Sequence, residues 1–571
     1  MRSLYRKFRN MRLTIFILAI FLSSAKCGEE VSTRLGSTMV RLKWVVNLTD
    51  QSVLFTVLQS NTRLGFVIIG FSDHGYYNTS DVCIYSGRQL RDGYIDRNFQ
   101  IQYDRSQDCQ LEKQYGNAFQ FRRRFSTCDP KDFAFEAGTT HFILAGGYVF
   151  TRDFNSDSVI KDMRFNLLLQ TDHPTVPVEF EKGHFKILAG GVHVPNQVDT
   201  YWCVIKRIPK AIAQKKHHII EVRPYIQQGN EHVVHHMEIF VCESEYQKEY
   251  DGECDALSNS KVARSCSGVL AAWAMGEGAI YYPPEAGRPI GGRKGKKYVK
   301  VEIHYNNPRK YSGIIDDSGI EIVVTQNLRK HDAGVMEIGL IYSDANSVPP
   351  GQSAFPLTGH CTADCTSKLP EEGIYIFGSQ LHAHKVGRKI VSNLYRNGVK
   401  IAEISRDDHF TPHWQHFVHL RPYVHVLPGD VLSTTCVYET LSRGAVTLGG
   451  YSLEEEMCVN YMYYYPASSV EVCKSAVDNT TLHNYFEHQH GIRERNLPIH
   501  QKYAKVKWNA ENVLSLMELF AVTPLNINCL QSDGSPFPGH PLNWTGVPQP
   551  IVYMAPLTMK RDGNECPALN D

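Results

Sequence analysis

Gly378-Ser-Gln-Leu-His-Ala-His-Lys-Val-Gly-Arg388 follows the apolar run Ile374-Tyr-Ile-Phe377, and together the two segments predict a β-strand that ends in a pair of histidines. Side chains alternate between the faces of a strand, so His382 and His384 share one face and stand about 6–7 Å apart. Two imidazoles at this spacing can reach one metal ion if a third ligand completes the site. The same pattern also occurs as an ordinary polar face, so this segment alone leaves metal binding and a structural role equally open.

The composition indicates a folded protein of several domains. The chain has 571 residues, of which 42% are hydrophobic, and this is enough for three or four domains with cores of their own. The formal net charge is +1, so the composition gives no sign of the excess positive charge that nucleic-acid-binding proteins carry. We therefore expect no nucleic-acid partner.

The N-terminal residues have the three regions of a secretory signal peptide. Basic residues precede the apolar stretch Leu13–Leu22, and Ser23-Ser-Ala25 supplies the small residues of a cleavage site. We expect residues 1–27 to be removed, with an uncleaved anchor as the alternative. No later segment has the roughly 18 apolar residues of a transmembrane helix, so the mature chain is expected to be lumenal. Four sequons are candidate glycosylation sites: Asn47, Asn78, Asn479 and Asn543.

Cysteine usage agrees with an oxidising compartment. The chain has 15 cysteines, and setting aside Cys27 at the signal boundary leaves 14, an even number that fits seven disulfides. Cys361-Thr-Ala-Asp-Cys365 has the spacing of half a zinc knuckle, but no second close pair accompanies it, so disulfides are favoured. Cys83 and Cys109 are candidates for an internal bridge of the first domain.

Short alternating segments, divided by Gly, Asn and Asp, predict β structure along most of the chain. The first of them form a predicted β-sandwich without a catalytic constellation. The prolines of Asp172-His-Pro-Thr-Val-Pro177 predict a linker. The assigned ranges are 38–150 for the sandwich, 151–198 for the linker, 199–325 and 326–475 for two further β-rich domains, and 476–571 for a C-terminal extension.

The second β-rich unit contains the adjacent histidines His235 and His236. Neighbours on an ideal strand point to opposite faces, so both can reach one ion only if the strand is bulged or one ring binds through its nearer nitrogen. A partner is available in His304, which strand alternation turns away from the core and toward a cleft. Another group of histidines lacks a clean metal spacing and is interpreted as polar loop and strand residues: His409, His413, His416, His419 and His425.

Six ordered segments resemble the copper type II, ascorbate-dependent monooxygenases. They are Tyr201–Cys203, His217–Ile220, Val234–Glu238, Val301–Pro308, Gln380–His384 and Glu456–Tyr461. Phe125–Asp132, with the sandwich before it, resembles the DOMON domain that precedes this core in the amine-hydroxylating members. The resemblance spans essentially the whole mature chain. It implies a mainly β fold, in which a DOMON β-sandwich is followed by two copper-binding, antiparallel, jelly-roll-like β-sandwich domains.

The resemblance implies two coppers per chain, with ascorbate as the electron donor and O₂ as the oxidant. The first copper, which transfers electrons, would be held by His235, His236 and His304. The second, where O₂ reacts, would be held by His382, His384 and Met457. The chemistry of the ligands agrees, because a thioether is a soft ligand that favours Cu(I) and does not suit zinc.

The reaction implied is hydroxylation of a benzylic carbon. Peptide-hydroxylating relatives place an arginine where this chain has Gln380, so an arylethylamine substrate is expected. Tyr461 and Tyr464 follow Met457 as in the amine hydroxylases and are candidate substrate contacts. The leading expectation is conversion of tyramine to octopamine in the lumen of secretory or synaptic vesicles, or after secretion. The alternatives are dopamine to noradrenaline, an orphan copper protein of the same family, and a secreted zinc hydrolase, although the chain lacks the His-Glu-x-x-His motif of the last.

The resemblance also implies six disulfides: Cys203–Cys254, Cys242–Cys266, Cys361–Cys473, Cys365–Cys529, Cys436–Cys458 and Cys128–Cys566. They leave Cys83 and Cys109 for the bridge within the first domain. Between Gly491 and Lys507 the chain has no counterpart of the inter-subunit cysteines of dopamine-hydroxylating relatives. A covalent dimer is therefore not expected, and a non-covalent homodimer stays open.

Overall fold

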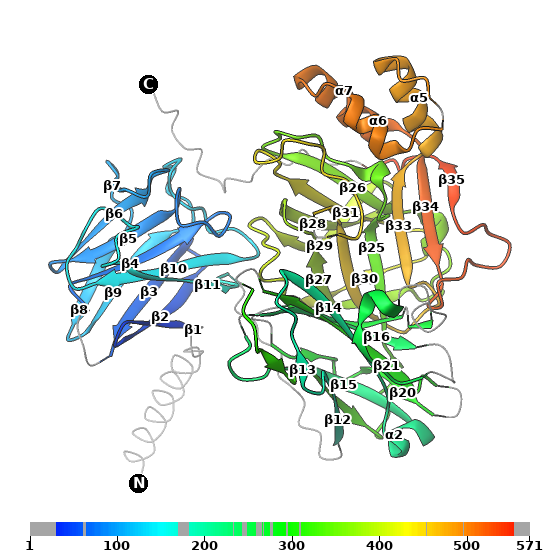
Figure 1. Cartoon of the computed structure of the whole chain (residues 1–571), viewed down its shortest axis with the longest axis horizontal. Coiled ribbons are helices and arrows are strands. Elements are labelled where there is room, and N and C mark those ends of the chain that lie inside the picture. The colour runs from blue at the N-terminus through cyan, green and yellow to red at the C-terminus, as the bar shows by residue number, and fades with distance from the viewer. Residues whose placement is uncertain are drawn as a thin grey trace, which may run out of the picture. The chain divides into compact units, whose positions relative to one another are not determined.

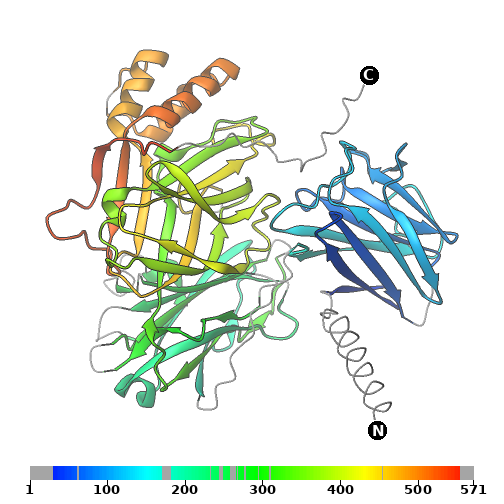
Figure 2. The ribbon, with the colours of Figure 1, turned by 180° about the vertical axis from the view of Figure 1, so that it is seen from behind.

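The structure is a computed structural model that describes residues 30–552, except for 61–63, 170–181, 232, 243–247, 258–264, 267, 275–277, 293–294, 308–309, 453 and 495. The predicted signal peptide, Cys27 and Cys566 lie outside the described residues. The fold is mainly β, as predicted (Figures 1 and 2). The chain divides near Thr171 into two compact units. No helix in the described part is long and apolar enough to cross a membrane.

The first unit is a β-sandwich. Its described strands form two sheets, with the orders β1-β2-β3-β9-β8 and β11-β10-β4-β5-β6-β7. Alternation along β2 buries Leu42 and Trp44 between the sheets, where Trp44 stacks on Phe142 with ring centroids 5.1 Å apart. The bounds are β1 Glu30–Leu35, β2 Thr38–Asn47, β3 Ser52–Gln59, β4 Phe66–Ser72, β5 Asp81–Ser86, β6 Gln89–Ile95, β7 Ile101–Tyr103, β8 Gln110–Tyr115, β9 Ala118–Arg124, β10 Thr140–Gly147 and β11 Ile160–Asn166.

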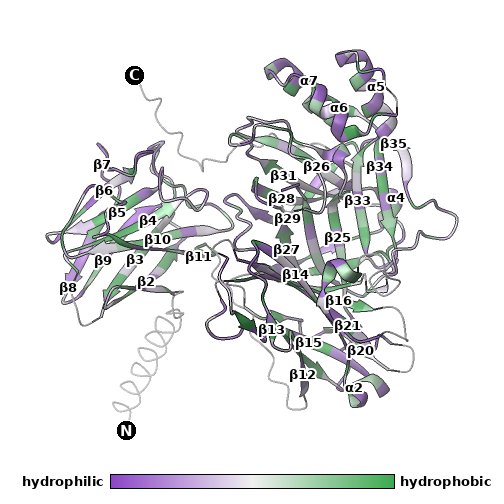
Figure 3. Cartoon of the chain, viewed as in Figure 1, coloured by the Kyte–Doolittle hydropathy of each residue, from purple (hydrophilic) through white to green (hydrophobic). Residues whose placement is uncertain are grey.

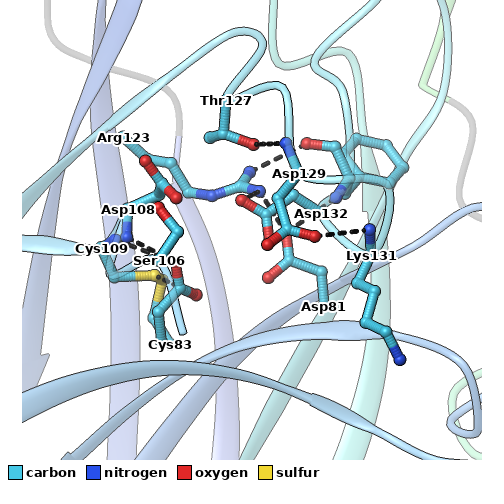
Figure 4. Close-up of polar contacts among 12 residues, drawn as sticks. Asp81, Cys83, Ser106, Asp108, Cys109, Arg123, Thr127, Asp129, Lys131 and Asp132 are labelled. Carbon is cyan, nitrogen blue, oxygen red and sulfur yellow. Dashed lines mark hydrogen bonds and ion pairs between the residues drawn. A yellow bond between two sulfur atoms is a disulfide. The ribbon is translucent and has the colours of Figure 1, made fainter. Parts of the chain in front are cut away.

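An ionic network is buried inside this sandwich (Figure 4). Arg123 has 1% of its surface exposed, and its guanidinium lies 2.5 Å from Asp81 and 3.1 Å from Asp132. Asp92 accepts hydrogen bonds from the backbone N–H groups of Asp108 and Cys109. Burial raises the pKa of Asp92 to about 7, because a carboxylate is poorly solvated there.

The linker predicted over 151–198 was wrong at both ends. Strand β11 pairs with β10 at the edge of the first unit, and β12 (Lys182–Leu188) pairs with β23 (Gly319–Thr325) in the second. The prolines that suggested a linker, Pro174 and Pro177, lie within 170–181, outside the described residues. A proline excludes ladder pairing only at its own position, so the strands on either side are unaffected.

The first half of the second unit is another sandwich, with sheets in the orders β12-β23-β15-β20-β24 and β17-β14-β21-β16-β18. Val204, Met237 and Ile303 are fully buried in its core. The bounds are β13 Val192–His193, β14 Asp199–Arg207, α2 Lys210–Gln214, β15 Lys216–Tyr225, β16 Val234–Cys242, β17 Tyr250–Glu253, β18 Gly268–Ala274, β19 Ile280–Tyr281, β20 Ala286–Gly291, β21 Tyr298–Asn306, β22 Ile315–Asp316, β23 Gly319–Thr325 and β24 His331–Asp332, with a 3₁₀ turn at Cys254–Leu257.

The second half pairs the sheet β30-β27-β32-β25-β33-β34-β35 with the sheet β26-β31-β28-β29. Most neighbours are antiparallel, but β25 and β33 run parallel. The bounds are β25 Gly334–Leu340, β26 Phe355–Cys361, α4 Ala363–Thr366, β27 Ile374–His382, β28 Gly387–Arg396, β29 Val399–Asp407, β30 Phe417–Val426, β31 Val431–Tyr438, β32 Val459–Tyr465 and β33 Val472–Val477, with a 3₁₀ turn at Asp344–Asn346.

The C-terminal extension is part of this second sandwich. Asp478 is the N-cap of helix α5 (Asn479–His490), and its side chain accepts from the backbone N–H of Thr481. Helices α6 (Ile499–Lys505) and α7 (Ala510–Val522) follow, and their hydrophilic residues appear purple in Figure 3. Strands β34 (Leu525–Leu530) and β35 (Trp544–Val547) then extend the sheet beyond β33.

The described cysteines form six disulfides, which are Cys83–Cys109, Cys203–Cys254, Cys242–Cys266, Cys361–Cys473, Cys365–Cys529 and Cys436–Cys458. Each is a pair expected from the sequence or from the resemblance. Cys361 and Cys365 belong to different bridges, so a zinc knuckle at these residues is ruled out. The partner expected for Cys128, Cys566, lies outside the described part of the chain.

Candidate metal centres

The first histidine cluster depends on a bulge in β16. The pairing of β16 with β21 shifts register between Val234 and His236, which leaves His235 as the extra residue. A bulge of this kind re-aims a side chain that would otherwise point to the opposite face. His235 and His236 therefore approach the same point, and His304 on β21 lies directly opposite His236.

Three ring nitrogens converge in this cluster. The Nδ1 atom of His236 lies 3.1 Å from Nδ1 of His235 and 3.3 Å from Nδ1 of His304. Two nitrogens that bind one ion at about 2 Å stand roughly 3 Å apart, so the three rings are spaced to share a metal. We call this cluster the three-histidine site.

Asp199 and Tyr201 hold His304 in place. Nε2 of His304 donates to Oδ1 of Asp199 over 3.0 Å, which leaves Nδ1 without a proton and free to bind a metal. The Tyr201 ring stacks on His304 with centroids 4.4 Å apart and planes 7° from parallel. His304 lies on the predicted face of β21, but it is fully buried rather than open to a cleft, because Tyr201 covers it.

The cluster keeps its imidazoles neutral. Burial, and to a smaller extent repulsion from His304, lowers the pKa of His235 to about 3. Burial also lowers the pKa of His236 and of His304, in the latter case against the opposing effect of Asp199. Neutral imidazoles are the form that binds metals, so the site is ready for a cation at physiological pH.

The second cluster lies where β27 and β32 run side by side. His382, the last residue of β27, is opposite Val459. Continuing this register by two residues places His384 opposite Met457, so strand pairing brings together residues more than 70 positions apart in the sequence. The Cys436–Cys458 disulfide anchors the segment that carries Met457. We call this cluster the methionine site.

Hydrogen bonds fix the tautomers of both histidines. Nδ1 of His382 lies 2.6 Å from Oε1 of Gln415, and Nδ1 of His384 lies 3.0 Å from the carbonyl of Glu455. Both acceptors require a proton on Nδ1, which leaves the Nε2 atoms as metal donors. The ring centroids are 5.3 Å apart. Burial, and to a smaller extent repulsion from His384, lowers the pKa of His382 to about 3.

Glu456 shapes the backbone around these ligands. Its carboxylate accepts from the N–H groups of His384 and Val386 over 2.9 and 2.6 Å. The Tyr438 hydroxyl donates to the Met457 carbonyl over 2.8 Å. Glu456 directly precedes Met457 in the sequence, but strand alternation alone does not predict that its carboxylate binds the backbone of the His384–Val386 segment.

The two candidate substrate-contacting tyrosines have different surroundings. The ring of Tyr461 lies 6.2 Å from that of His382. Tyr464 faces the other side of β32, where it is fully buried and its hydroxyl donates to the Val470 carbonyl over 3.1 Å. This placement supports Tyr461 as a substrate contact and gives no support to Tyr464.

One histidine of the group interpreted as ordinary polar residues lies beside the three-histidine site. The His413 ring faces that of His235 edge-on, with centroids 6.1 Å apart. The other members have structural surroundings; His416 stacks on Trp414 and His425 on Tyr375.

Both clusters suit copper. Three neutral imidazoles form a site for a borderline ion, whereas two imidazoles beside a thioether favour Cu(I) over zinc. Two such sites on adjoining β-sandwiches define a class of protein, a two-domain copper oxidoreductase preceded by a third β-sandwich.

Comparison with known proteins identifies the family. Residues 185–312 and 331–486 match the N-terminal and C-terminal domains of the copper type II ascorbate-dependent monooxygenases, and residues 36–147 match the DOMON domain. The chain is 44% identical to tyramine beta-hydroxylase of Caenorhabditis briggsae, over 95% of this chain and 96% of that protein. It is 36% identical to human dopamine beta-hydroxylase, over 92% and 87% of the two chains. Human DBH-like monooxygenase protein 1 is 31% identical, over 82% and 81%.

The chain belongs to the copper type II ascorbate-dependent monooxygenase family. It is a copper-dependent monooxygenase that uses ascorbate as reductant and acts with O₂ on a small molecule. The disulfides of the described cysteines agree with folding in the secretory pathway.

Proposed function

We propose that this enzyme hydroxylates the benzylic β-carbon of an arylethylamine, with tyramine as substrate and octopamine as product. The proposal is supported by the greater identity to a tyramine beta-hydroxylase than to the dopamine beta-hydroxylases. The observation that carries the amine preference is the position of Tyr461 between the methionine site and an unpaired carboxylate, that of Glu238.

Glu238 is suited to hold an ammonium group. It lies on β16 two residues after His236 and shares that residue's face of the strand. In the described part of the chain no cation lies within ion-pair distance of its carboxylate, although its cross-strand neighbour Glu302 is paired with Lys300 at 3.0 Å. Burial, and to a smaller extent repulsion from the carboxylate of Glu302, raises the pKa of Glu238 to about 7. A bound ammonium would supply the missing countercharge.

Tyr461 connects this carboxylate with the methionine site. Burial raises the pKa of the Tyr461 hydroxyl, and the negative charges of Glu238 and Glu337 raise it further. Glu337 is itself satisfied by Lys474 and Tyr342. An arylethylamine could therefore rest its ring against Tyr461 and its ammonium on Glu238, with the benzylic carbon directed toward His382.

A peptide substrate is disfavoured by Gln380. Its amide donates to the Ala272 carbonyl across the boundary between the two sandwiches, over 3.1 Å. An amide provides no charge for a substrate carboxylate, and this one is already engaged in holding the domains together.

We further propose two coppers per chain, one bound through the Nδ1 atoms of His235, His236 and His304 and one bound through His382, His384 and Met457. When bound, they would supply one-electron transfer and O₂ activation. The protein's own contribution is orientation: Gln415 and Asp199 fix the tautomers, Tyr201 excludes water from His304, and Glu456 positions His384. The lumen of secretory vesicles is the proposed compartment, and the exposed Asn47, Asn479 and Asn543 and the half-buried Asn78 are proposed glycosylation sites.

The test is steady-state turnover of the copper-loaded protein with ascorbate and O₂, comparing tyramine, dopamine and a glycine-extended peptide. Preference for tyramine is expected. Equal or better turnover of dopamine would move the assignment to noradrenaline synthesis, and turnover of none would leave an orphan monooxygenase.

A variant pair tests the role of Glu238. Glu238→Gln should raise the KM for tyramine about 10- to 100-fold, the value of one hydrogen bond to a charged group, and should leave a phenylethyl compound without the amino group unaffected. Glu302→Gln is the matched control, because that carboxylate is already paired. An equal effect of both variants would remove Glu238 from the substrate site.

A further inference from the structure

One side of the three-histidine site is accessible. His304 is fully buried beneath Tyr201, whereas His235 and His236 are half-buried. A reductant from solution must therefore approach the His235–His236 side, because electron transfer from a small molecule requires close approach to a ligand edge. The side chain that stands at that edge is His413, which is exposed and lies edge-on to His235.

His413 is held firmly although its ring is exposed. It lies in the segment that joins β29 to β30, and its backbone N–H donates to Oγ1 of Thr411 over 3.3 Å. The following residues, Trp414 and Gln415, are buried, and Gln415 is bonded to His382. One short segment thus contacts both metal centres. In the described part of the chain neither ring nitrogen of His413 has a hydrogen-bond partner, so both are available to a ligand.

Positive charge lies near this edge. Lys385 and Arg388 follow His384 in sequence. Burial lowers the pKa of His413, and the positive charges of Arg388 and Lys385 lower it further. Lys385 likewise acts on His235 and His304. The two cations are partly compensated, since Lys385 pairs with Glu454 and Arg388 lies 3.6 Å from Glu439. Their field favours an anion, and the imidazole of His413 supplies the directed hydrogen bond.

We propose that the ascorbate anion docks against His413, at the accessible edge of His235. The inference rests on the proposed occupation of the three-histidine site by copper. Ascorbate fits this location because it combines a negative charge with enediol oxygens that accept a hydrogen bond from an imidazole N–H. His413 is in this view a positioning residue for the reductant and not a metal ligand, since it lies outside the group of ring nitrogens that converge.

The electron balance at this location is simple. The ascorbate monoanion gives one electron to the oxidised metal site and its remaining enediol proton to water at the exposed edge. It then leaves as the semidehydroascorbate radical anion. A second ascorbate, or the same molecule after a second encounter, supplies the second electron that each turnover needs.

The experiment is anaerobic stopped-flow reduction of the Cu(II)-loaded protein, without amine substrate. His413→Phe retains the edge contact with His235 but removes the hydrogen bond, and His413→Gln restores a donor. The rate constant with ascorbate should fall about tenfold in His413→Phe and recover in His413→Gln, which corresponds to one net hydrogen bond. Reduction by N,N-dimethyl-p-phenylenediamine, which cannot use an anion site, should change less than twofold.

The matched control is His184→Ala, which removes an exposed histidine from another part of the second unit. Copper content and the electron paramagnetic resonance spectrum of each variant show whether the metal sites are intact. Equal slowing with both reductants, or no slowing in His413→Phe, would overturn the docking site. Tyramine is absent from this assay, so a wrong substrate assignment leaves its result intact, while failure of the wild-type protein to bind copper at the three-histidine site would overturn both proposals.

Discussion

Gln415 accepts a hydrogen bond from Nδ1 of His382 over 2.6 Å and thereby decides which nitrogen of that histidine faces the methionine site. The orientation of the amide is set independently, because its Nε2 donates to the Pro412 carbonyl over 3.1 Å. The position of Gln415 follows from strand pairing. Gln380 is opposite Phe417 in the β27–β30 ladder, and continuing that register brings Gln415 opposite His382.

Loss of this acceptor should weaken the methionine site selectively. We expect Gln415→Ala to lower copper affinity there about 10- to 100-fold, the usual effect of losing a hydrogen-bond partner of a metal-bound histidine. The measurement is copper retained per chain during dialysis against a graded chelator. Gln415→Glu keeps an acceptor at the same position and should retain copper; equal loss in both variants would argue against the tautomer explanation.

Met457 should matter for Cu(I) more than for protein stability. We expect Met457→Ala to abolish hydroxylation and to leave a folded, secreted protein, because a soft thioether is lost from the site where Cu(I) must be held. X-ray absorption of the reduced protein should lose its sulfur contribution. Met462→Ala on β32 is the control, since that buried side chain lies in the core and its loss should cost about 2–5 kcal/mol of stability without changing the copper spectrum. Retained activity in Met457→Ala would remove Met457 from the site.

The first unit should lose stability as the pH rises from 4 to 7. The pKa of Asp92 is raised by burial to about 7, from an ordinary value of 3.8. The folded state therefore binds a proton that the unfolded state releases, so the stabilisation is complete below pH 4 and is lost as the pH rises through 7. Hydrogen exchange of the β5 and β6 amides in the full chain measures it. Asp92→Asn should flatten the profile, and a profile that instead steepens would contradict the assignment.

Strand parity was enough to predict which of the candidate histidines share a face of a strand, whereas their assignment to two metal sites came from the resemblance and stays a prediction. The alternation at His382 and His384 and the bulge required at His235 follow from the geometry of a single strand. Gln415 and His413 could not be predicted in this way, because their positions depend on which strands pair over a distance in sequence. His304 was placed on the correct face, but its burial depends on Tyr201 from another strand. The prediction of a linker over 151–198 is wrong at both ends for a local reason, because a proline excludes strand pairing only at its own position and not in the residues around it.

Asp199 should control the three-histidine site as Gln415 controls the methionine site. Its Oδ1 accepts from Nε2 of His304 and from the Asn306 amide, at 3.0 and 2.8 Å. Without this acceptor the His304 ring can place its proton on Nδ1, where it would compete with the metal. We expect Asp199→Ala to lower copper affinity about 10- to 100-fold at this site and to slow reduction by every reductant equally, unlike His413→Phe. Asp199→Asn keeps an oxygen acceptor and should retain most of the copper. Selective loss from the methionine site in Asp199→Ala would show that the two centres are not held independently.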